Sequence, residues 1–476
     1  MSRCPIPLGS EAQTAVSSSA PPTENISRSI TRIEQRLDLR LLHARNPQRY
    51  PVLLESAASG TPQGRYDILL ALPVSQLLLD SSGKLHGGDS GGSDFLSELD
   101  RQWQAERAPS IPGMPKPVPF ISGWFLFLGY ELAAQIEPRL NLQKPAGWPV
   151  AMAARMLGAI AYDHELECSF ICAESNEVFE HLYTDVEQNT GALEPVPATL
   201  VQGVTEEDAE RYIAAVAQAQ QHIHRGDIYQ ANLSRSWRTQ LLGPVSDIAL
   251  YAALSESNPG SFAALARWED QAVISSSPER LLCLRGDVMQ TRPIAGTRPR
   301  GSNADEDAAL VAELIEHPKE RAEHIMLIDL ERNDLGRVCQ PGTVEVDEYM
   351  TLESYAHVHH IVSNVRGQMR EDVSPVDAIR AVFPGGTITG CPKVRCMEII
   401  AALEDHPRGA YTGSLGYLDL DGDCDLNILI RTLVRDGRSL TLRAGAGIVA
   451  DSIAEREVEE TRAKARGLLL ALGETV

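Results

Sequence analysis

The sequence has no long hydrophobic run. Its most apolar stretches, residues 67–79 and 123–132, fall short of the roughly 20 residues that a membrane-spanning helix needs. The N-terminus also has no apolar core of the kind that secretory signals carry. We therefore expect a cytoplasmic protein that does not bind a membrane.

Ordered cysteine spacing and basic clusters are also missing. The eight cysteines form no CxxC pair and no zinc-finger spacing, so we expect reduced thiols that act as packing residues. The chain has 43 Lys and Arg against 65 Asp and Glu, a formal charge of −22, and no dense basic stripe. This balance argues against a nucleic-acid partner. With 43% hydrophobic residues, the chain can bury a full core, which excludes global disorder.

Composition divides the chain into four parts. Residues 1–28 are rich in Ser, Pro, Thr and Ala and are expected to be a disordered tail. An N-terminal subdomain at 29–186 is followed by a polar, proline-containing linker at 187–203 and a catalytic region at 204–476. Predicted strands outnumber helices and follow one another through short turns. This order favours an antiparallel α+β fold over a doubly wound parallel sheet.

The second half gives the clearest element signals. A strand is expected at DIYQANLSRS (227–236), an acidic helix at 305–316, and a further helix that starts at Pro318. Asp421-Gly422 predicts the turn of a hairpin. The last strand, SLTLRAGAG, is expected to lead into a terminal helix at about 452–472.

Three motifs resemble known ligand sites but are incomplete. GAGIVA (445–450) fits a dinucleotide fingerprint, yet no second strand follows it. We expect only that Gly445 and Gly447, at a turn before the terminal helix, expose N–H groups to an anion. FPGGTITGCPK (383–393) has Cys-Pro where a phosphate loop needs Lys and Ser or Thr. DLDGDCD (419–425) lacks the glycine and final glutamate of a calcium loop.

Acidic residues on two predicted helices could serve a metal. Glu457, Glu460 and Lys464 share one helix face, which is either a solvated stripe or part of a site. Glu323 lies on the helix after Pro318. Carboxylates from two helices together with water suit Mg²⁺. The histidines His357, His359 and His360 lack matched ligands elsewhere, so one His used in chemistry is favoured over a zinc site.

A series of longer segments resembles the chorismate-utilising enzymes, a family that includes anthranilate synthase and aminodeoxychorismate synthase component I. The matching segments occupy most of residues 220–470 in family order and are GDIYQANLSR, SSPERL, RPIAGTRPRG, AEHIMLIDLERNDLGRV, HHIVSNVRG, FPGGTITGCPKVRCMEII, YTGSLGY, IRTL and AGAGIVADS…EVEETRAKA. LLESA, GRYDILLA and FLGYEL match more loosely. The resemblance implies two subdomains, with antiparallel sheets packed face to face and helices outside.

The resemblance also implies site roles. Mg²⁺ would be held by Glu323, Glu457 and Glu460 and would bind a carboxylate of chorismate. Glu279 matches the general acid that protonates the leaving C4 hydroxyl, so we expect a raised pKa there. His360 matches a histidine near the pyruvyl-bearing end of the ring. The matched substrate-binding positions are Thr387, Tyr411, Arg431, Lys464 and the backbone of Gly445 and Gly447.

Two positions refine the expected reaction. Water-adding relatives carry a lysine base where this chain has Gln230, and glutamine cannot take a proton from water. Many aminodeoxychorismate synthases have a nucleophilic lysine in PIKGT, but this chain has PIAGT, with Ala295 and Thr297. TGCPKVRCMEII, HVHHIVS and GRYDILLA still resemble the aminodeoxychorismate branch. We therefore expect amination of chorismate to 4-amino-4-deoxychorismate, towards 4-aminobenzoate and folate, through non-covalent 2-amino-2-deoxyisochorismate.

Two other functions are weighed against this expectation. One is anthranilate synthesis for tryptophan, and the other is a silent chorismate- or tryptophan-binding regulator. No glutaminase motif is recognisable, and the resemblance implies that ammonia comes from a separate class I glutaminase subunit. LLESA resembles the family's tryptophan-pocket motif, although a packing strand explains it equally well.

Overall fold

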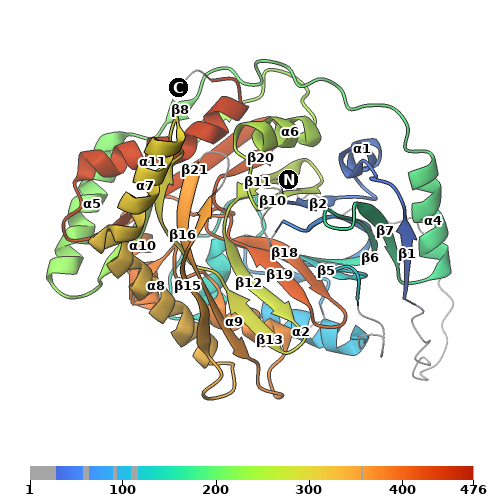
Figure 1. Cartoon of the computed structure of the whole chain (residues 1–476), viewed down its shortest axis with the longest axis horizontal. Helices are drawn as coiled ribbons and strands as arrows, with labels where there is room; N and C mark the ends of the chain where they lie inside the picture. The colour runs from blue at the N-terminus through green and yellow to red at the C-terminus, as the bar shows by residue number, and fades with distance from the viewer. Residues whose placement is uncertain (1–27, 57–63, 89–93, 109–115, 355–357, 475–476) are drawn as a thin grey trace.

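The structure is a computed structural model that describes residues 28–56, 64–88, 94–108, 116–354 and 358–474. The tail expected at 1–28 lies outside these residues except for Arg28. Every strand pairing is antiparallel, and helices cover the outside of the sheets (Figure 1). The expected α+β class is confirmed.

Strand pairing starts at the long central strand β6 (Ala151–Asp163) and runs in two directions, which we call the first arm and the second arm. The first arm consists, in pairing order, of β3 (Tyr66–Leu79), β2 (Val52–Glu55), β10 (Phe262–Trp268), β11 (Gln271–Ser277), β20 (Thr432–Asp436), β21 (Ser439–Ile448) and β9 (Gln230–Gln240). β9 ends this arm and also pairs with the short strands β8 (Thr205–Glu206) and β17 (Gly390–Cys391).

The second arm leaves β6 through another neighbour. It consists of β5 (Gly123–Leu128), β18 (Ser414–Asp419), β19 (Cys424–Asn427), β12 (Arg280–Arg285), β13 (Val288–Thr291) and β16 (Val358–Gln368), which also pairs with β14 (Ile294–Pro299) and β15 (Glu345–Ser354). The edge beside β6 is extended by β7 (Cys168–Ala173) and β1 (Ser29–Ile33), and β4 (Leu85–His86) pairs with β3.

The two arms pack face to face. Phe127 on β5 of the second arm lies 5.3 Å, centroid to centroid, from Trp268 on β10 of the first arm. The same buried cluster includes Ala264 and Val273 from the first arm. Burial of each large side chain stabilises this interface by roughly 1.5–3 kcal/mol. The face-to-face packing expected from the resemblance is thus present.

Helices form the outer layer. α5 (Ala209–His224), α6 (Asp247–Ser257), α10 (Lys393–Leu403) and α11 (Ala454–Ala471) contact strands or helices of the first arm. α7 (Ala304–Glu316), α8 (Pro318–Gly336) and α9 (Pro375–Val382) contact the second arm, and α2 (Phe95–Glu106) packs on α9. The N-terminal region adds α1 (Leu39–Arg45), the one-turn η1 (Tyr130–Leu132) and α3 (Ala133–Ile136), and α4 (Asn176–Glu187). Among the residues described, no helix is both long and apolar enough to cross a membrane.

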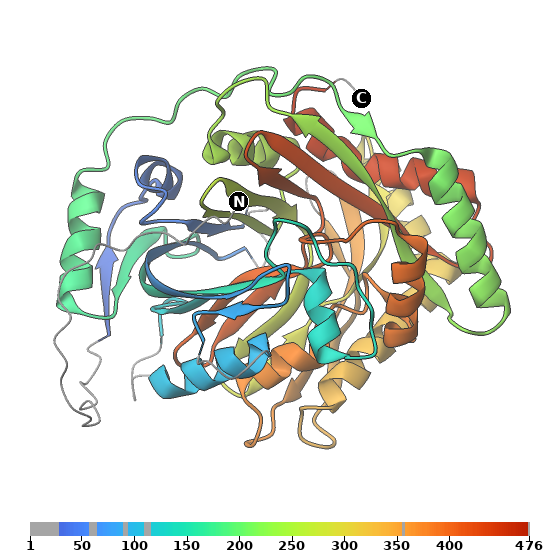
Figure 2. The same ribbon diagram turned by 180° about the vertical axis from the view of Figure 1, so that it is seen from behind.

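Elements from the two halves of the sequence alternate in the sheets. β2 pairs with β10, and β5 pairs with β18, so N-terminal and C-terminal strands are hydrogen-bonded neighbours. The polar segment after α4 has no regular structure up to an isolated bridge at Val201, and it arcs over one edge of the molecule (Figures 1 and 2). The halves therefore share one continuous set of strands.

Local predictions in the second half are mostly confirmed. β18 and β19 form the expected hairpin around Asp421-Gly422, and α7 and α8 follow the predicted bounds. The terminal helix begins at Ala454. The predicted last strand is confirmed as β21, which continues one residue further, to Ile448, in register with β9. The turn also expected at Gly445 and Gly447 is wrong, because both glycines lie inside this strand.

Candidate active site

The residues expected to form the site come from both arms. Gln230 begins β9, Gly445 and Gly447 lie on β21, and Glu323 and Lys464 come from α8 and α11. Ala295 and His360 lie on β14 and β16 of the second arm. Glu279 lies between β11 and β12, Arg431 directly precedes β20, and Thr387 lies between α9 and β17. Segments far apart in the sequence thus converge where the end of the first arm meets the second.

Glu279 is a buried carboxyl in the turn between β11 and β12. Burial raises its pKa to about 7, and the hydrogen bond from Thr387 and the charges of Arg431 and Lys464 oppose this rise. The Thr387 hydroxyl donates to Glu279 Oε1 over 2.6 Å. This rise has the direction expected from the sequence. A carboxyl with this pKa can hold a proton near neutral pH and release it to a leaving group.

Arg431 lies close enough to influence both Glu279 and His360. Its backbone has a φ of 51°, in the left-handed region that non-glycine residues rarely adopt. Burial lowers the pKa of its guanidinium, and the nearby Glu279 acts in the opposite direction. Its side chain forms no hydrogen bond or ion pair with any residue that the structure describes. A half-buried cation whose side chain has no hydrogen-bond partner favours an anionic ligand.

His360 lies on the opposite face of β16 from His359. His359 contacts Asp307 through Nε2 (2.9 Å) and Ser354 through Nδ1 (2.7 Å), whereas His360 Nδ1 donates to the Gly296 carbonyl (3.4 Å). Burial and the charge of Arg431 lower the pKa of His360 to about 4, so its ring is neutral at pH 7. His357 lies outside the described residues.

Gln230 and Glu323 form a second polar pair in the site. Gln230 Nε2 donates to Glu323 Oε1 over 2.9 Å, and Gln230 Oε1 has no hydrogen-bond partner among the described residues. Gly447 makes this pair possible, because a Cβ there would lie 2.3 Å from Gln230 Nε2. The site therefore holds a buried, unsatisfied acceptor beside a carboxylate.

The strand position of Gly445 and Gly447 changes how they could bind a ligand. Opposite them, the amides of Asn232 and Ser234 donate to Thr389 and Glu404 and do not pair with β21. These are therefore non-hydrogen-bonded pairs of the ladder, so the polar backbone groups of both glycines point away from β9. Lys464 Nζ donates to Gly445 O over 3.0 Å on that side. The expected backbone donors thus lie on an open strand edge instead of a turn.

The remaining predicted substrate and reaction positions lie near the same region. The Tyr411 hydroxyl would be 2.7 Å from a Cβ at Gly445, so the missing side chain makes room for the tyrosine. Ala295 is buried on β14, next to the Gly296 that bonds to His360. The backbone of Thr297 pairs with His360.

The carboxylates proposed for Mg²⁺ match the chemistry of that ion. The pKa of Glu323 is raised by burial, and the charges of Glu320 and Glu460 add to the rise, so several negative groups approach one another here. Glu460 forms a 2.8 Å ion pair with Lys464. Within the described part of the chain, no three His, Cys, Asp or Glu side chains are close enough to bind one metal ion together. One or two carboxylates with water and substrate oxygens satisfy Mg²⁺, so the donor set fits.

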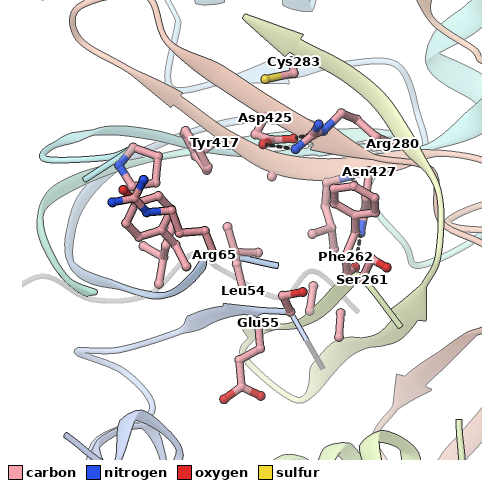
Figure 3. A pocket seen from close by; sticks show the side chains of 18 of the residues that line it. Leu54, Glu55, Arg65, Ser261, Phe262, Arg280, Cys283, Tyr417, Asp425 and Asn427 are labelled. Carbon is pink, nitrogen blue, oxygen red and sulfur yellow. Dashed lines mark hydrogen bonds and ion pairs between the residues drawn. The ribbon is translucent and has the colours of Figure 1, made fainter. Parts of the chain in front are cut away.

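A separate cavity of about 300 Å³ lies between the arms (Figure 3). The end of the LLESA segment borders it, and the hydroxyls of Ser56 and Ser261 are buried there without partners among the described residues. Glu55 points away from the cavity in Figure 3, and its carboxylate binds Arg40 (2.8 Å). The tryptophan pocket expected from the motif stays a prediction.

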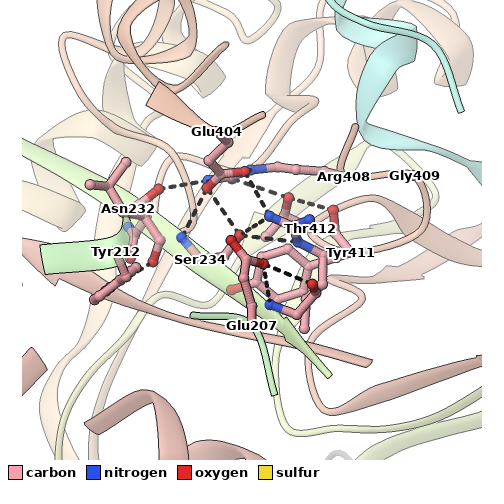
Figure 4. A network of polar contacts seen from close by, with 12 residues as sticks. Glu207, Tyr212, Asn232, Ser234, Glu404, Arg408, Gly409, Tyr411 and Thr412 are labelled. Carbon is pink, nitrogen blue, oxygen red and sulfur yellow. Dashed lines mark hydrogen bonds and ion pairs between the residues drawn. The ribbon is translucent and has the colours of Figure 1, made fainter. Parts of the chain in front are cut away.

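A buried ion cluster, here called the Glu404 cluster, fixes the position of the site (Figure 4). Glu404, at the end of α10, accepts from Arg408 (2.7 Å), Arg443 (3.0 Å) and both Ser234 groups (2.9 and 3.0 Å). Although burial alone would raise it, the two arginines hold the pKa of Glu404 below its usual value. This cluster ties α10 to β9 and β21.

Arg408 extends the Glu404 cluster to the ligand-facing loops. Its guanidinium donates to Asn232 O (2.6 Å), and Asn232 Nδ2 donates to Thr387 O (2.7 Å). Its backbone N–H donates to Glu131 of the FLGYEL segment (2.7 Å). Tyr411 follows three residues later, with its ring beneath the guanidinium. The cluster thus positions Thr387 and Tyr411 together.

The Glu404 cluster was not predicted from the sequence. Glu404 and Arg408 show i,i+4 spacing, but their partners lie some 170 and 39 residues away, in β9 and β21. One signal was present: in QANLSRS the polar residues Gln230, Asn232 and Ser234 alternate, which places them on one face of a strand.

Three comparisons with known proteins agree on the kind of molecule. A family model described as chorismate binding enzyme matches residues 54–470. An aminodeoxychorismate synthase component 1 from Bacillus subtilis is 43% identical over 443 residues, which cover 89% of this chain and 92% of that protein. An anthranilate synthase component I-like protein from Synechocystis is 45% identical over 365 residues, 75% of this chain and 74% of that protein.

The solved structures include one with clear sequence similarity. Anthranilate synthase component I from Streptococcus pneumoniae superposes with a TM-score of 0.75 at 28% identity, covering 86% of this chain and 93% of that one. Relatives named for two different reactions are thus similar to this chain at nearly the same level.

Loss of the Glu404 carboxylate should destabilise the protein strongly. Glu404→Ala leaves two buried guanidiniums without their anion, and we expect the free energy of unfolding to fall by about 3–5 kcal/mol in urea denaturation. Glu459→Ala removes an exposed ion pair with Arg462 (2.8 Å) and should cost at most about 1 kcal/mol. Equal losses in the two variants would contradict the central role of the cluster.

Glu279 should titrate near pH 7 in the free protein, instead of near the ordinary 4.5. Burial raises the pKa of Glu131 and Glu331 to about 7 and 8 as well. We therefore expect carboxyl ¹³C NMR to show a few glutamates that stay protonated until the pH rises through about 7 or higher, and Glu279→Gln to remove one of these signals. Thr387→Val deletes a hydrogen bond that favours the ionised form, so the transition should move to higher pH. A Glu279 signal that is ionised at pH 5.5 would refute this prediction.

Proposed function

This chain belongs to the chorismate-binding enzyme family, and from that premise we propose that it aminates chorismate to 4-amino-4-deoxychorismate, as an aminodeoxychorismate synthase component I. In this reaction ammonia is the nucleophile, Glu279 is the acid, and a separate glutaminase subunit supplies the ammonia.

The unsatisfied carbonyl of Gln230 is the observation that carries the choice of nucleophile. Its amide nitrogen is held by Glu323, so the orientation of the amide is set and Oε1 remains as an acceptor. Ammonia can donate an N–H to this oxygen while its lone pair attacks the substrate. Water in the same place would need a base, and an amide is not one.

Glu279 supplies the proton for the leaving group. Nitrogen forms a bond at C2 of chorismate, the ring double bonds shift, and the C4–O bond breaks. The hydroxyl leaves as water with the Glu279 proton, and the bound ammonium loses a proton to solvent. The product of this step is 2-amino-2-deoxyisochorismate. Thr387, which bonds to Glu279 Oε1, orients the carboxyl for the transfer.

Positive groups would hold the dianionic substrate. Arg431 is a half-buried guanidinium without a described hydrogen-bond partner, and Lys464 lies at the open edge of β21 beside Gly445. Mg²⁺ held by one or two of the expected ligands Glu323, Glu457 and Glu460, together with water, would neutralise a substrate carboxylate. His360, neutral at pH 7, adds a polar contact without a charge.

Ala295 bears on the second step of the proposed reaction, in which the intermediate is converted to product. Alanine offers no nucleophile, so a second ammonia attacks C4 of the intermediate and the C2 amine departs as ammonia. The alternative is an anthranilate synthase, in which the same intermediate loses pyruvate. PIAGT favours that alternative, whereas TGCPKVRCMEII and HVHHIVS favour the proposed product.

A product assay with chorismate, Mg²⁺ and ammonium tests the proposal. We expect 4-aminobenzoate after addition of a 4-amino-4-deoxychorismate lyase, and no adduct in the intact mass of the enzyme during turnover. Fluorescent anthranilate would establish the alternative. Tight chorismate binding without turnover would identify a silent regulator, and a lysine adduct would exclude the non-covalent route.

Within the same assay, Gln230→Lys tests the nucleophile assignment. The ammonium group would occupy the position of the acceptor, so we expect amination to fall at least tenfold and isochorismate to form. Gln218→Lys, on the exposed face of α5, is the matched control and should leave both products unchanged. Full amination by Gln230→Lys would remove Gln230 from the mechanism.

We also propose that the cavity between the arms binds tryptophan. Its two unpaired hydroxyls, Ser56 and Ser261, offer donors to a carboxylate, and Phe262 and Tyr417 line the same space. Isothermal titration with L-tryptophan should give saturable binding that Ser56→Leu weakens at least tenfold. Ser82→Leu, at an exposed turn, should not change it. Absence of binding by the unmodified protein would refute this proposal.

A further inference from the structure

Glu331 is a buried carboxyl to which the chemistry described above gives no role. It lies on α8, about two turns after Glu323, and is 5% exposed. The Thr291 hydroxyl lies beside it and has no other partner among the described residues. Lys393, whose charge also reaches Glu331, forms its ion pair with Asp334 instead. A carboxyl buried with so little compensation is costly, and such groups gather at functional sites.

Two consecutive loop residues link Glu331 to the acid Glu279. A Cβ at Gly386 would lie 3.3 Å from Glu331 Oε1, and the next residue, Thr387, donates to Glu279 Oε1 over 2.6 Å. The two carboxyls are close enough for the charge of Glu279 to act on Glu331. Buried polar groups without protein partners bind water, so a water molecule on the Thr291 hydroxyl would complete the connection.

Asp334 lies one turn further along α8 and connects Glu331 to the outer surface. Residues three apart on a helix are neighbours, and the charge of Asp334 is the strongest charge that acts on Glu331. Asp334 is only 2% exposed, but with Lys393 it lines an open groove of about 820 Å³ between α8, α10 and the segment after α3, here called the α8–α10 groove. Asp334 therefore lies between Glu331 and the solvent of this groove.

Charged side chains on the other elements that contact α8 bind one another or distant partners. Arg380 of α9 binds Asp94 (2.6 Å), Arg298 of β14 binds Glu313 of α7 (3.1 Å), and Arg366 of β16 binds Glu345 of β15 (2.7 Å). The groups that act on Glu331 are therefore Asp334, Lys393, Thr291 and Glu279.

The acidities of Glu279 and Glu331 are matched. Burial raises the pKa of Glu331 to about 8, the charges of Asp334 and Glu279 add to the rise, and Lys393 and Thr291 oppose it. The pKa of Glu279 is raised to about 7. Near neutral pH, Glu331 therefore still holds a proton when Glu279 has lost one. Transfer between groups of similar pKa costs little free energy.

The proposed reaction requires such a proton before the site empties. Glu279 gives its proton to the C4 hydroxyl in the first step, and the C2 amine also needs a proton to depart in the second. Glu279 is 6% exposed, and bound substrate would cover it further. Direct return of a proton from solvent is therefore slow while the intermediate is bound.

We propose that Asp334 and Glu331 form a carboxyl relay that returns a proton from the α8–α10 groove to Glu279 between the two steps. This inference rests on the proposed amination. The O–H bond of Glu331 breaks as an O–H bond forms on Glu279 through the intervening water, and the Glu331 carboxylate then takes a proton from Asp334. Asp334 regains its proton from a hydronium ion or buffer acid in the groove, and no electrons are transferred. Glu331 touches no substrate and acts through Glu279 as a positioning residue for the proton.

Glu331→Gln tests the relay, because the amide keeps the shape of the side chain but holds no acidic proton. With chorismate, Mg²⁺ and ammonium, we expect turnover to fall at least about tenfold at pH 8 and less than about threefold at pH 6, where solvent supplies protons more readily. We also expect 2-amino-2-deoxyisochorismate to accumulate, since the first step uses the proton already on Glu279. Glu313→Gln on α7, whose side chain is 56% exposed, is the matched control and should change neither result.

Rescue by a small acid separates a relay from a structural role. In Glu331→Ala, added acetate should raise turnover at least about threefold, because it replaces the missing carboxyl. An equal loss of turnover at both pH values without rescue by acetate would overturn the proposal, and so would full activity of Glu331→Gln.

Carboxyl ¹³C NMR tests the link between the two carboxyls without turnover. Removal of the negative charge in Glu279→Gln should lower the pH at which Glu331 titrates, and an unchanged Glu331 transition would overturn the relay. If the unmodified chain does not aminate chorismate with ammonium, the amination is refuted instead, and the NMR titration still decides whether the carboxyls are connected.

Discussion

The buried carboxylate of Glu404 is the interaction on which the arrangement of the site depends. It neutralises two arginines that are themselves almost fully enclosed, and through them it joins α10, β9, β21 and the loop that carries Tyr411. Ion pairs of this kind contribute little net stability compared with apolar packing, but they tolerate only one geometry. At this position, that single geometry aligns Asn232 and Thr387, and through them the carboxyl of Glu279.

The electrostatics of the site run against those of the whole chain. The protein carries a large excess of acidic groups, yet the half-buried Arg431 has no described hydrogen-bond partner and Lys464 reaches the open edge of β21. Burial shifts two neighbouring pKa values in opposite directions. It raises the pKa of Glu279 to about 7 and lowers that of His360 to about 4, and both shifts favour the uncharged form. A site of this composition has fixed positive charge for an anion and a neutral acid that can release a proton, within one small volume.

Much of this could be predicted from the sequence where the signal is local. The Asp421-Gly422 turn, the start of α8 at Pro318 and the elevated pKa of Glu279 depend on nearby residues or on a motif. The direction in which the backbone groups of Gly445 and Gly447 point could not be predicted in the same way, because it depends on the register of β21 with β9. The Glu404 cluster was missed for a related reason. Its members are ordinary charged residues whose pairing exists only after distant strands meet.

The pairing of β2 with β10 and of β5 with β18 has a consequence for how the chain folds during synthesis. When the first 186 residues have left the ribosome, these two N-terminal strands still have unpaired hydrogen-bonding edges. Their partners, β10 and β18, begin about 210 and 290 residues after the starts of β2 and β5. At roughly 5–20 residues per second, the nascent chain carries open edges for many seconds. Such edges can pair with other chains, so this topology leaves the nascent chain open to edge-to-edge aggregation until the C-terminal strands are made.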